Sequence, residues 1–341
     1  MTKKKPISVA LQGGGAYGAF TWGVLDRLLE DPRISIEGLS GTSAGAMNAL
    51  ALVQGFVNNG HAGQARQNLE NFWRKVSQYG VFNPMKSSLI DPITSHLHAA
   101  HHNLSYTMMN MMQSVLSPYY WNPYNVNPLK TLAEEFFDFE SLRHHKEHKV
   151  FICATHVYSG KLKIFPNEKI TLDTLLASSC LPFLFQAVHI DGEPYWDGGF
   201  VGNPVIYPLM NHCQTSDILV IQLTRQTCEK NPTTANEILE RHKEISYNSC
   251  LMREMRAISF ITKLIDSKVI QDPKMRRFNM HIIRQSEENS SSLRNALNTD
   301  MGFFETLFHQ GREQADRWID AHFPSIGKES TANIEEDFVD L

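Results

Sequence analysis

The residues with the clearest capacity for chemistry lie in residues 41–45, which read Gly-Thr-Ser-Ala-Gly. Ser43 is the central residue, and Gly41 and Gly45 flank it at a spacing that lets the chain turn sharply between a strand and a helix. The helix that begins there directs free N–H groups and the positive end of its dipole toward the serine. Ser43 is therefore a candidate nucleophile, although a glycine–serine turn by itself is only moderately specific.

A run of glycines in residues 13–18 could stabilise the negative charge that develops during such an attack. It reads Gly-Gly-Gly-Ala-Tyr-Gly and follows the apolar residues 7–11. Glycine tolerates positive φ and close backbone approach, so successive N–H groups can point into one concavity and bind an oxyanion. The candidate donors are Gly13, Gly14, Gly15, Ala16 and Gly18.

A serine is a weak nucleophile until a neighbouring base takes its proton. The chain has 15 histidines, but none lies in a recognisable catalytic sequence context. Asp197 can do this directly if burial and a hydrogen bond from the serine bring its basicity into a useful range. Gly198 and Gly199 follow it and would allow close approach. Because Asp-Gly-Gly alone usually forms a turn, this hypothesis depends on the other two segments.

The elements that must position these segments alternate between strand and helix. Residues 7–11 and 34–39 have the apolar pattern of buried strands, and residues 19–30 and 46–56 have that of helices. This order is typical of a parallel sheet. Later patterns predict helices over 61–78, 128–143, 172–179, 235–267 and 302–322, a hairpin over 149–165, and strands over 217–224 and 277–283.

In this order, the three segments resemble the patatin-like phospholipase family: a glycine-rich oxyanion loop, a nucleophile elbow and an Asp-Gly-Gly motif. The resemblance covers roughly residues 6–225 and includes the approach to Asp197 from residue 177. It implies an α/β fold, a three-layer α/β/α sandwich around a mostly parallel central sheet. It also implies a Ser43–Asp197 dyad that hydrolyses lipid acyl esters, as a phospholipase A or lysophospholipase does, with neither a metal nor another cofactor. Tyr17 is a departure, because the family often has Arg or Lys there.

Several other functions fit part of the pattern. Residues 252–266 resemble a C-terminal extension of a bacterial patatin-like subgroup, and some of its members are labelled polyhydroxybutyrate depolymerases. A polyhydroxyalkanoate depolymerase or a thioesterase would use the same dyad. Gly13, Gly15 and Gly18 also fit the fingerprint of a dinucleotide-binding oxidoreductase, with Glu37 at a suitable distance for a ribose contact. A non-catalytic lipid-binding protein and an α/β-hydrolase with a Ser-Asp-His triad remain further alternatives.

Composition and charge limit the partners. The net charge is −4, and residues 328–341 alone, with five acids and one lysine, account for it. A neutral body argues against nucleic-acid binding. Five dispersed cysteines and the absence of a signal peptide or spanning segment predict a cytoplasmic protein, with non-classical export as an alternative. We expect a lipid or other acyl-ester substrate and peripheral membrane contact, whereas the sequence does not indicate an oligomeric state.

The predicted organisation is a catalytic domain over residues 6–225, a helical extension over 226–324 packed on it as one globule, and a disordered acidic tail over 325–341. The methionine and aromatic cluster at 104–121 could be a lid or a wall of the acyl-chain site, but packing over the sheet is favoured. Histidines group at 96–102 and at 144–148. Without carboxylate or cysteine partners at convincing spacing, these groups favour a solvated face over a metal site.

Overall fold

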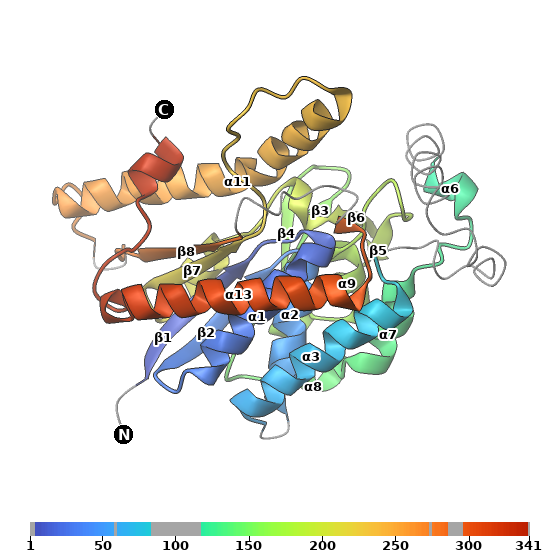
Figure 1. Cartoon of the computed structure of the whole chain (residues 1–341), viewed down its shortest axis with the longest axis horizontal. Helices are drawn as coiled ribbons and strands as arrows, with labels where there is room; N and C mark the ends of the chain where they lie inside the picture. The colour runs from blue at the N-terminus through green and yellow to red at the C-terminus, as the bar shows by residue number, and fades with distance from the viewer. Residues whose placement is uncertain (1–3, 58–59, 83–116, 273–274, 286–295, 340–341) are drawn as a thin grey trace.

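The computed structural model describes residues 4–57, 60–82, 117–272, 275–285 and 296–339 (Figure 1). The predicted cluster at 104–121 therefore lies mostly outside the described residues, and the histidines at 96–102 lie wholly outside them. One eight-stranded sheet runs through the protein in the order β5-β6-β3-β2-β1-β7-β8, with β4 paired to β3. The strands are β1 (Lys5–Leu11), β2 (Ile34–Gly41), β3 (Lys149–His156), β4 (Leu162–Pro166), β5 (Val188–Ile190), β6 (Glu193–Asp197), β7 (Asp217–Gln222) and β8 (Asn279–Arg284).

The centre of the sheet is parallel. β1 pairs in parallel with β2 and β7, β2 with β3, and β7 with β8, whereas β4, β5 and β6 form antiparallel pairs at one side. The apolar runs form strands because both of their faces are covered, as parallel sheets require. In β1, Ile7, Val9 and Leu11 belong to one hydrophobic core and Ala10 to a second. The alternation separates two cores on opposite faces, so the fold is the expected three-layer α/β/α sandwich.

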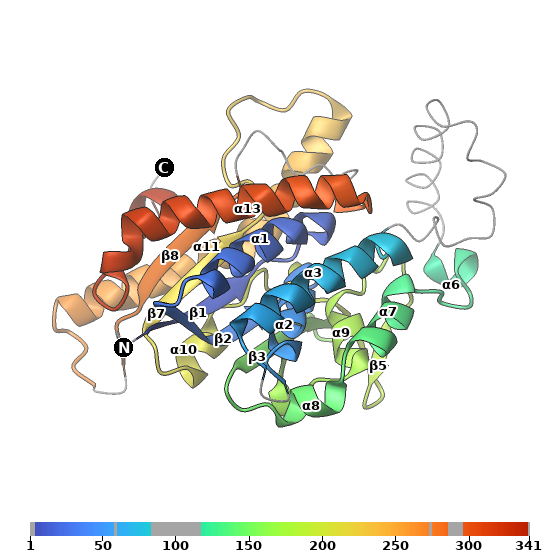
Figure 2. The same ribbon diagram turned by 60° about the horizontal axis from the view of Figure 1, so that its bottom comes forward.

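Helices cover both faces (Figure 2). The first core contains residues of α1 (Gly18–Glu30), α2 (Ala44–Gln54), α3 (Ala62–Tyr79) and α13 (Met301–His322). The second contains residues of α10 (Tyr207–His212) and α11 (Ala235–Asp266). The shorter helices are α6 (Pro118–Trp121), α7 (Pro128–Phe136), α8 (Phe139–His144) and α9 (Leu172–Ser178). In the described residues, no helix combines the length and apolarity needed to cross a bilayer.

Two glycines bring α13 against α1. A Cβ on Gly23 would lie 2.0 Å from the carbonyl oxygen of Phe308, and one on Gly311 would lie 2.1 Å from that of Phe20. The helix backbones can therefore pack at a distance that any larger residue would prevent. This contact fixes the C-terminal helix directly over the helix that follows the glycine loop.

The C-terminal part of the chain differs from its predicted organisation. The strand predicted over 277–283 is present as β8, which extends the sheet beside β7 and so makes part of the C-terminal extension continuous with the sheet. The acidic tail, which composition predicts to be disordered, packs against α11 through the short helix Glu335–Val339. Phe338 is 1% exposed in the second core, and its carbonyl accepts a hydrogen bond from Arg256. The tail is ordered because Phe338 is buried and because its acidic side chains pair with basic residues. Its polar composition therefore gave a wrong prediction of disorder.

Two smaller differences concern helix and strand boundaries. The single helix predicted over 128–143 is two helices, α7 and α8, because the Asp138 side chain caps the second by accepting from the Ser141 N–H at 3.0 Å. The stretch before Asp197, where the sequence analysis predicts no strand, contains β5 and β6. These strands matter because Asp197 is the last residue of β6 and pairs there with Ala154 of β3.

Candidate active site

Ser43 lies in the turn between β2 and α2, at the N-cap position of α2. Its φ of 54° and ψ of −122° form a conformation that is strained for a residue with a side chain. The flanking glycines make the turn possible. A Cβ on Gly45 would lie 2.3 Å from the carbonyl oxygen of Leu11, and a Cβ on Gly41 would lie 2.5 Å from the backbone of Gly45. Residues 41–45 therefore form a sharp strand-to-helix turn, and both of its glycines are required sterically.

The Ser43 side chain lies near enough to the carboxyl group of Asp197 to act on its pKa through hydrogen bonding. The Ser43 backbone N–H donates to Ser178 Oγ at 3.0 Å, so a side chain from the end of α9 also holds the elbow. Among the described residues, no histidine is hydrogen-bonded to Ser43. The geometry thus brings together the predicted serine and aspartate and favours them over the alternative of a histidine-containing triad.

Asp197 ends β6 and is held by its backbone on both sides. Its N–H donates to the Cys180 carbonyl at 2.8 Å, and its carbonyl accepts from Thr155 Oγ1 at 2.8 Å. Its Oδ1 accepts from the Gly199 N–H at 2.7 Å. Gly198 must be glycine because a Cβ there would lie 2.4 Å from the Cys153 carbonyl oxygen. The Asp-Gly-Gly motif is a tight turn, and it aims the carboxyl group at the elbow.

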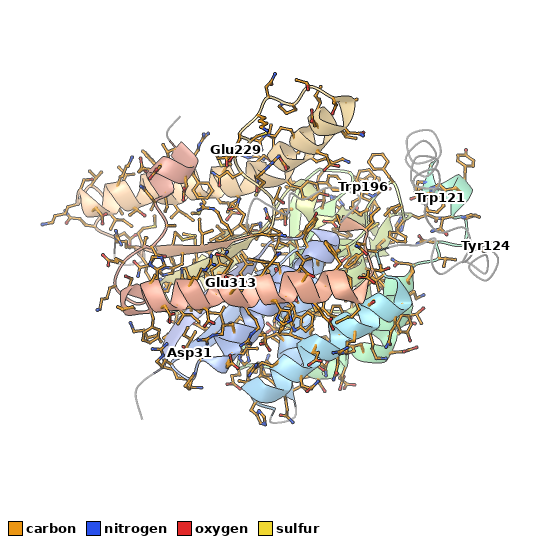
Figure 3. The ribbon with its side chains drawn as sticks, viewed as in Figure 1. Asp31, Trp121, Tyr124, Trp196, Glu229 and Glu313 are labelled. Atoms are coloured by element: carbon orange, nitrogen blue, oxygen red, sulfur yellow. The ribbon has the colours of Figure 1, made fainter. Side chains whose placement is uncertain are left out.

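Burial changes the acidity of this carboxyl group. Asp197 is 2% exposed, and the loss of hydration raises its pKa to about 7, although hydrogen bonds from Gly199 and Ser43 act in the opposite direction. A carboxylate with an ordinary pKa is a poor proton acceptor at neutral pH. A pKa near 7 places this group where a general base is most effective. Figure 3 shows the position of this site in the sheet: Trp196, which precedes Asp197, lies at the opposite end of the strands from Asp31.

The glycine loop runs beside the elbow, and three of its N–H groups already have acceptors. The Gly13 N–H donates to Asn203 Oδ1 at 2.6 Å, the Tyr17 N–H to the Gly14 carbonyl, and the Gly18 N–H to the Gly15 carbonyl. Among the described residues, the N–H groups of Gly14, Gly15 and Ala16 have no protein acceptor. Those three are the donors that a bound oxyanion could use.

Polar side chains that the sequence analysis missed hold the loop in place. Asn203 Oδ1 accepts from the Gly13 N–H, and its Nδ2 donates to the Gly13 carbonyl at 3.2 Å, so one side chain holds both backbone polar groups of Gly13. Gln12 Oε1 accepts from the N–H groups of Leu223 and Thr224, and its Nε2 donates to Asn248 Oδ1 of α11. These partners lie up to 236 positions away along the chain, so no local pattern could have revealed them.

The long helix α11 also contacts the Asp-Gly-Gly turn. A Cβ on Gly199 would lie 3.1 Å from Cε1 of Tyr247, a residue of α11. Burial raises the pKa of Tyr247, and the negative charge of Asp197 raises it further. Tyr17, where the family often has a cation, is 2% exposed and packs edge-on against Phe303 at 6.0 Å. Tyr17 therefore serves packing between the loop and α13.

Glu37, the residue considered for a ribose contact, has other partners. Its carboxylate accepts from the N–H groups of Gln214 and Thr215 and pairs with Lys149. It therefore holds the turn before β7, which removes the second half of the dinucleotide-binding pattern.

A family model of patatin-like phospholipases matches residues 9–210, more than half of the chain. The chain belongs to the patatin-like phospholipase family. The matched region contains the glycine loop, the elbow and the Asp-Gly-Gly turn, and membership supports a lipid hydrolase. A search of curated proteins gives no match to this patatin-like chain.

Solved structures with similar folds include VipD from Legionella pneumophila, at 15% identity and a TM-score of 0.46, covering 99% of this chain and 73% of that one. The type III effector ExoU gives 13% identity and a TM-score of 0.37, covering 94% of this chain and 54% of that one. A complex of SpcU with ExoU from Pseudomonas aeruginosa gives 14% identity and a TM-score of 0.30, with coverages of 99% and 77%. Similarity this low does not identify substrates or partners for this chain.

Proposed function

We propose that this protein is a serine acyl-ester hydrolase that acts on lipids through a Ser43–Asp197 dyad. The observation that carries the proposal is a desolvated carboxyl group, with a pKa of about 7, that lies within reach of the Ser43 side chain. A serine needs a base within hydrogen-bonding reach, and a base works best when its pKa is near the working pH. Family membership supports the lipid class of the substrate.

The reaction would proceed in two stages. Asp197 accepts the Ser43 proton while Oγ attacks the ester carbonyl carbon, and the resulting tetrahedral intermediate carries its charge on the former carbonyl oxygen. Protonated Asp197 then returns the proton to the departing alcohol or lysolipid, which leaves an acyl-serine. Water attacks that ester with Asp197 again as base and releases the fatty acid. No step requires a metal or an organic cofactor.

The oxyanion would be stabilised by the loop N–H groups that lack protein acceptors. Of the candidates predicted from the sequence, Gly14, Gly15 and Ala16 are the donors in this proposal. Gly13 and Gly18 shape the loop, because their N–H groups already donate to Asn203 and to backbone carbonyls. Preorganised donors of this kind contribute about 10²–10³ in rate each. The N-terminus of α2 adds positive potential beside Ser43.

Fluorophosphonate labelling tests the nucleophile. The wild type should be labelled, and Ser43→Ala and Asp197→Asn should not. Ser159→Ala is a matched control, because Ser159 is an exposed serine that is also hydrogen-bonded to a side chain, His156 Nδ1, at 2.7 Å. It should be labelled as fully as the wild type. Label retained in Ser43→Ala would refute the nucleophile assignment.

Hydrolysis of a chain-length series of phospholipids, oligomeric hydroxybutyrates and acyl thioesters identifies the substrate class. Phospholipid turnover supports the proposal, whereas preferred turnover of the polyester or the thioester selects one of those alternatives. Lipid binding that is unchanged in Ser43→Ala, with no turnover of any ester, would indicate a lipid-binding protein. Tight NAD or FAD binding without labelling would indicate an oxidoreductase.

A further inference from the structure

The turn between α8 and β3 gathers three potential metal ligands away from the proposed dyad. His145 is the C-cap residue of α8, and His148 immediately precedes β3. Their rings are stacked, with centroids 5.2 Å apart, and His145 Nε2 lies 2.9 Å from His148 Nδ1. One ligand atom from each of His145, Glu147 and His148 falls within 4.8 Å of the others. The third nearby histidine, His144, instead contacts the Glu140 carbonyl.

We propose that His145, Glu147 and His148 bind a divalent transition-metal ion such as Zn²⁺ and thereby fix this turn. Two imidazoles and one carboxylate are a donor set that zinc accepts, with water as a fourth ligand. Ligand atoms about 2.0–2.1 Å from a tetrahedral ion lie roughly 3.3 Å from one another. The two ring nitrogens would have to separate by only a few tenths of an ångström.

The three side chains differ in burial in a way that suits metal capture. His148 is buried, its ring packs on Phe56 at 4.3 Å, and its carbonyl accepts from Asn167 Nδ2. His145 is half-buried beside it, and the stacking of the two rings holds both imidazoles close together. Glu147 is exposed and can rotate to close the site.

The proposed ion lies too far from Ser43 and Asp197 to take part in hydrolysis. Asp197 pairs with Ala154, six positions after His148 on or beside β3. At about 3.3 Å per residue that separation is about 20 Å. In Figure 1, α8 lies at the bottom edge of the molecule, whereas β6 lies well above it. The site is therefore structural, and it is independent of the proposed function.

Metal binding by the full chain without a purification tag tests the proposal. After chelator treatment and removal of the chelator, the wild type should bind about one equivalent of Zn²⁺. Its thermal midpoint should rise with Zn²⁺ but not with Mg²⁺, which prefers oxygen ligands. His145→Ala and the exposed Glu147→Gln should each weaken binding at least about tenfold. His144→Ala, the neighbouring control, should bind like the wild type.

Three results would overturn the proposal: no stoichiometric binding to the wild type, undiminished binding by His145→Ala, or an equal loss in His144→Ala. Co²⁺ in place of Zn²⁺ gives a second readout, since a four-coordinate site with nitrogen ligands produces visible d–d absorption bands that His145→Ala should abolish. Ester hydrolysis and fluorophosphonate labelling should be the same with and without the ion, so a failure here leaves the proposed function untouched.

Discussion

Two buried aspartates on the same sheet have opposite acidities. Asp197 ends β6 and Asp217 begins β7, and they are 2% and 4% exposed. Burial raises the pKa of Asp197 to about 7. Burial also acts to raise the pKa of Asp217, but hydrogen bonds from His281, Gly327 and Asn279 outweigh it, and the pKa of Asp217 is lowered.

The difference lies in the donors that surround each carboxyl group. Asp217 Oδ1 accepts from His281 Nε2 at 3.1 Å, Asn279 Nδ2 at 3.2 Å and Gly327 N–H at 2.8 Å. Asp197 accepts from one backbone N–H and from the Ser43 hydroxyl. The donors around Asp217 thus stabilise its charged form, whereas Asp197, the proposed base, has fewer donors around it and keeps a raised pKa.

The largest expected effect separates the two aspartates by activity. Asp197→Asn can still accept the Gly199 N–H and contact Ser43, but it cannot take a proton. We expect ester hydrolysis to fall by about 10³–10⁴-fold. Asp217→Asn should keep activity within about threefold, because it does not contact the elbow. Steady-state kinetics of both variants checks this, and comparable losses would refute the distinction.

The same two substitutions should change stability in opposite directions. The raised pKa of Asp197, compared with its ordinary 3.8, implies that ionisation costs the folded state roughly 4 kcal/mol above pH 7. Below about pH 4 the carboxyl group is protonated in both states, so the folded protein keeps its full stability. Part of that stability is lost progressively as pH rises toward and through about 7. Asp197→Asn should therefore raise the free energy of unfolding by up to about 4 kcal/mol at pH 8 and leave it unchanged at pH 4.

For Asp217 the sign is reversed. Its lowered pKa stabilises the folded protein above the unfolded-state pKa, and that contribution is lost as pH falls through the folded-state pKa. Asp217→Asn should lower the free energy of unfolding at pH 7 by about 1.5–3 kcal/mol, with a smaller loss in acid. Urea unfolding of both variants at several pH values tests the pair, and a shared sign at pH 8 would contradict the comparison.

The pH dependence of hydrolysis should report the ionisation of Asp197 directly. Because the base must be unprotonated, kcat/KM should fall about tenfold per pH unit below a pKa of about 7 and be level above it. A profile that stays flat down to pH 5 would mean that Asp197 is as acidic as an ordinary carboxyl group, or is not the base.

The smallest expected effect concerns backbone strain at Ser43, the proposed nucleophile that Asp197 serves. Ser43→Ala and Ser43→Gly both remove the hydroxyl and should both be inactive. Only glycine relieves the strain at a φ of 54°. We expect Ser43→Gly to be more stable than Ser43→Ala by about 1–2 kcal/mol in chemical unfolding. Equal stabilities would show that the turn stores no strain.

Much of the fold could be predicted from local patterns. Short apolar runs predicted strands and 3.6-residue periodicity predicted helices, and both patterns are local in the sequence. They correspond to β1, β2, β7, α1, α3 and α13. The division of residues 128–143 into α7 and α8 was not predicted, because the helix cap at Asp138 outweighed the continuous apolar periodicity. The order of the acidic tail escaped because it depends on Phe338 meeting a core built from distant strands and helices.

The candidate site divides in the same way. Its three motifs could be found from the sequence because glycine is required wherever backbones approach closely. In each motif the required glycines lie within a few residues of the functional group, so the sequence shows them directly. The clamp of Asn203 on Gly13 and the link from Gln12 to Asn248 left no such trace, because each joins residues separated by 190 positions or more.

The sequence by itself determined which groups could react: a serine in a glycine turn, a glycine-rich loop and an aspartate before two glycines. Only the tertiary structure decided how basic that aspartate is and which loop N–H groups have no protein acceptor. Both properties depend on which groups surround a given atom and on how far water is excluded from it. The sheet order and the packing of α11 and α13 set those surroundings, and no local pattern encodes them.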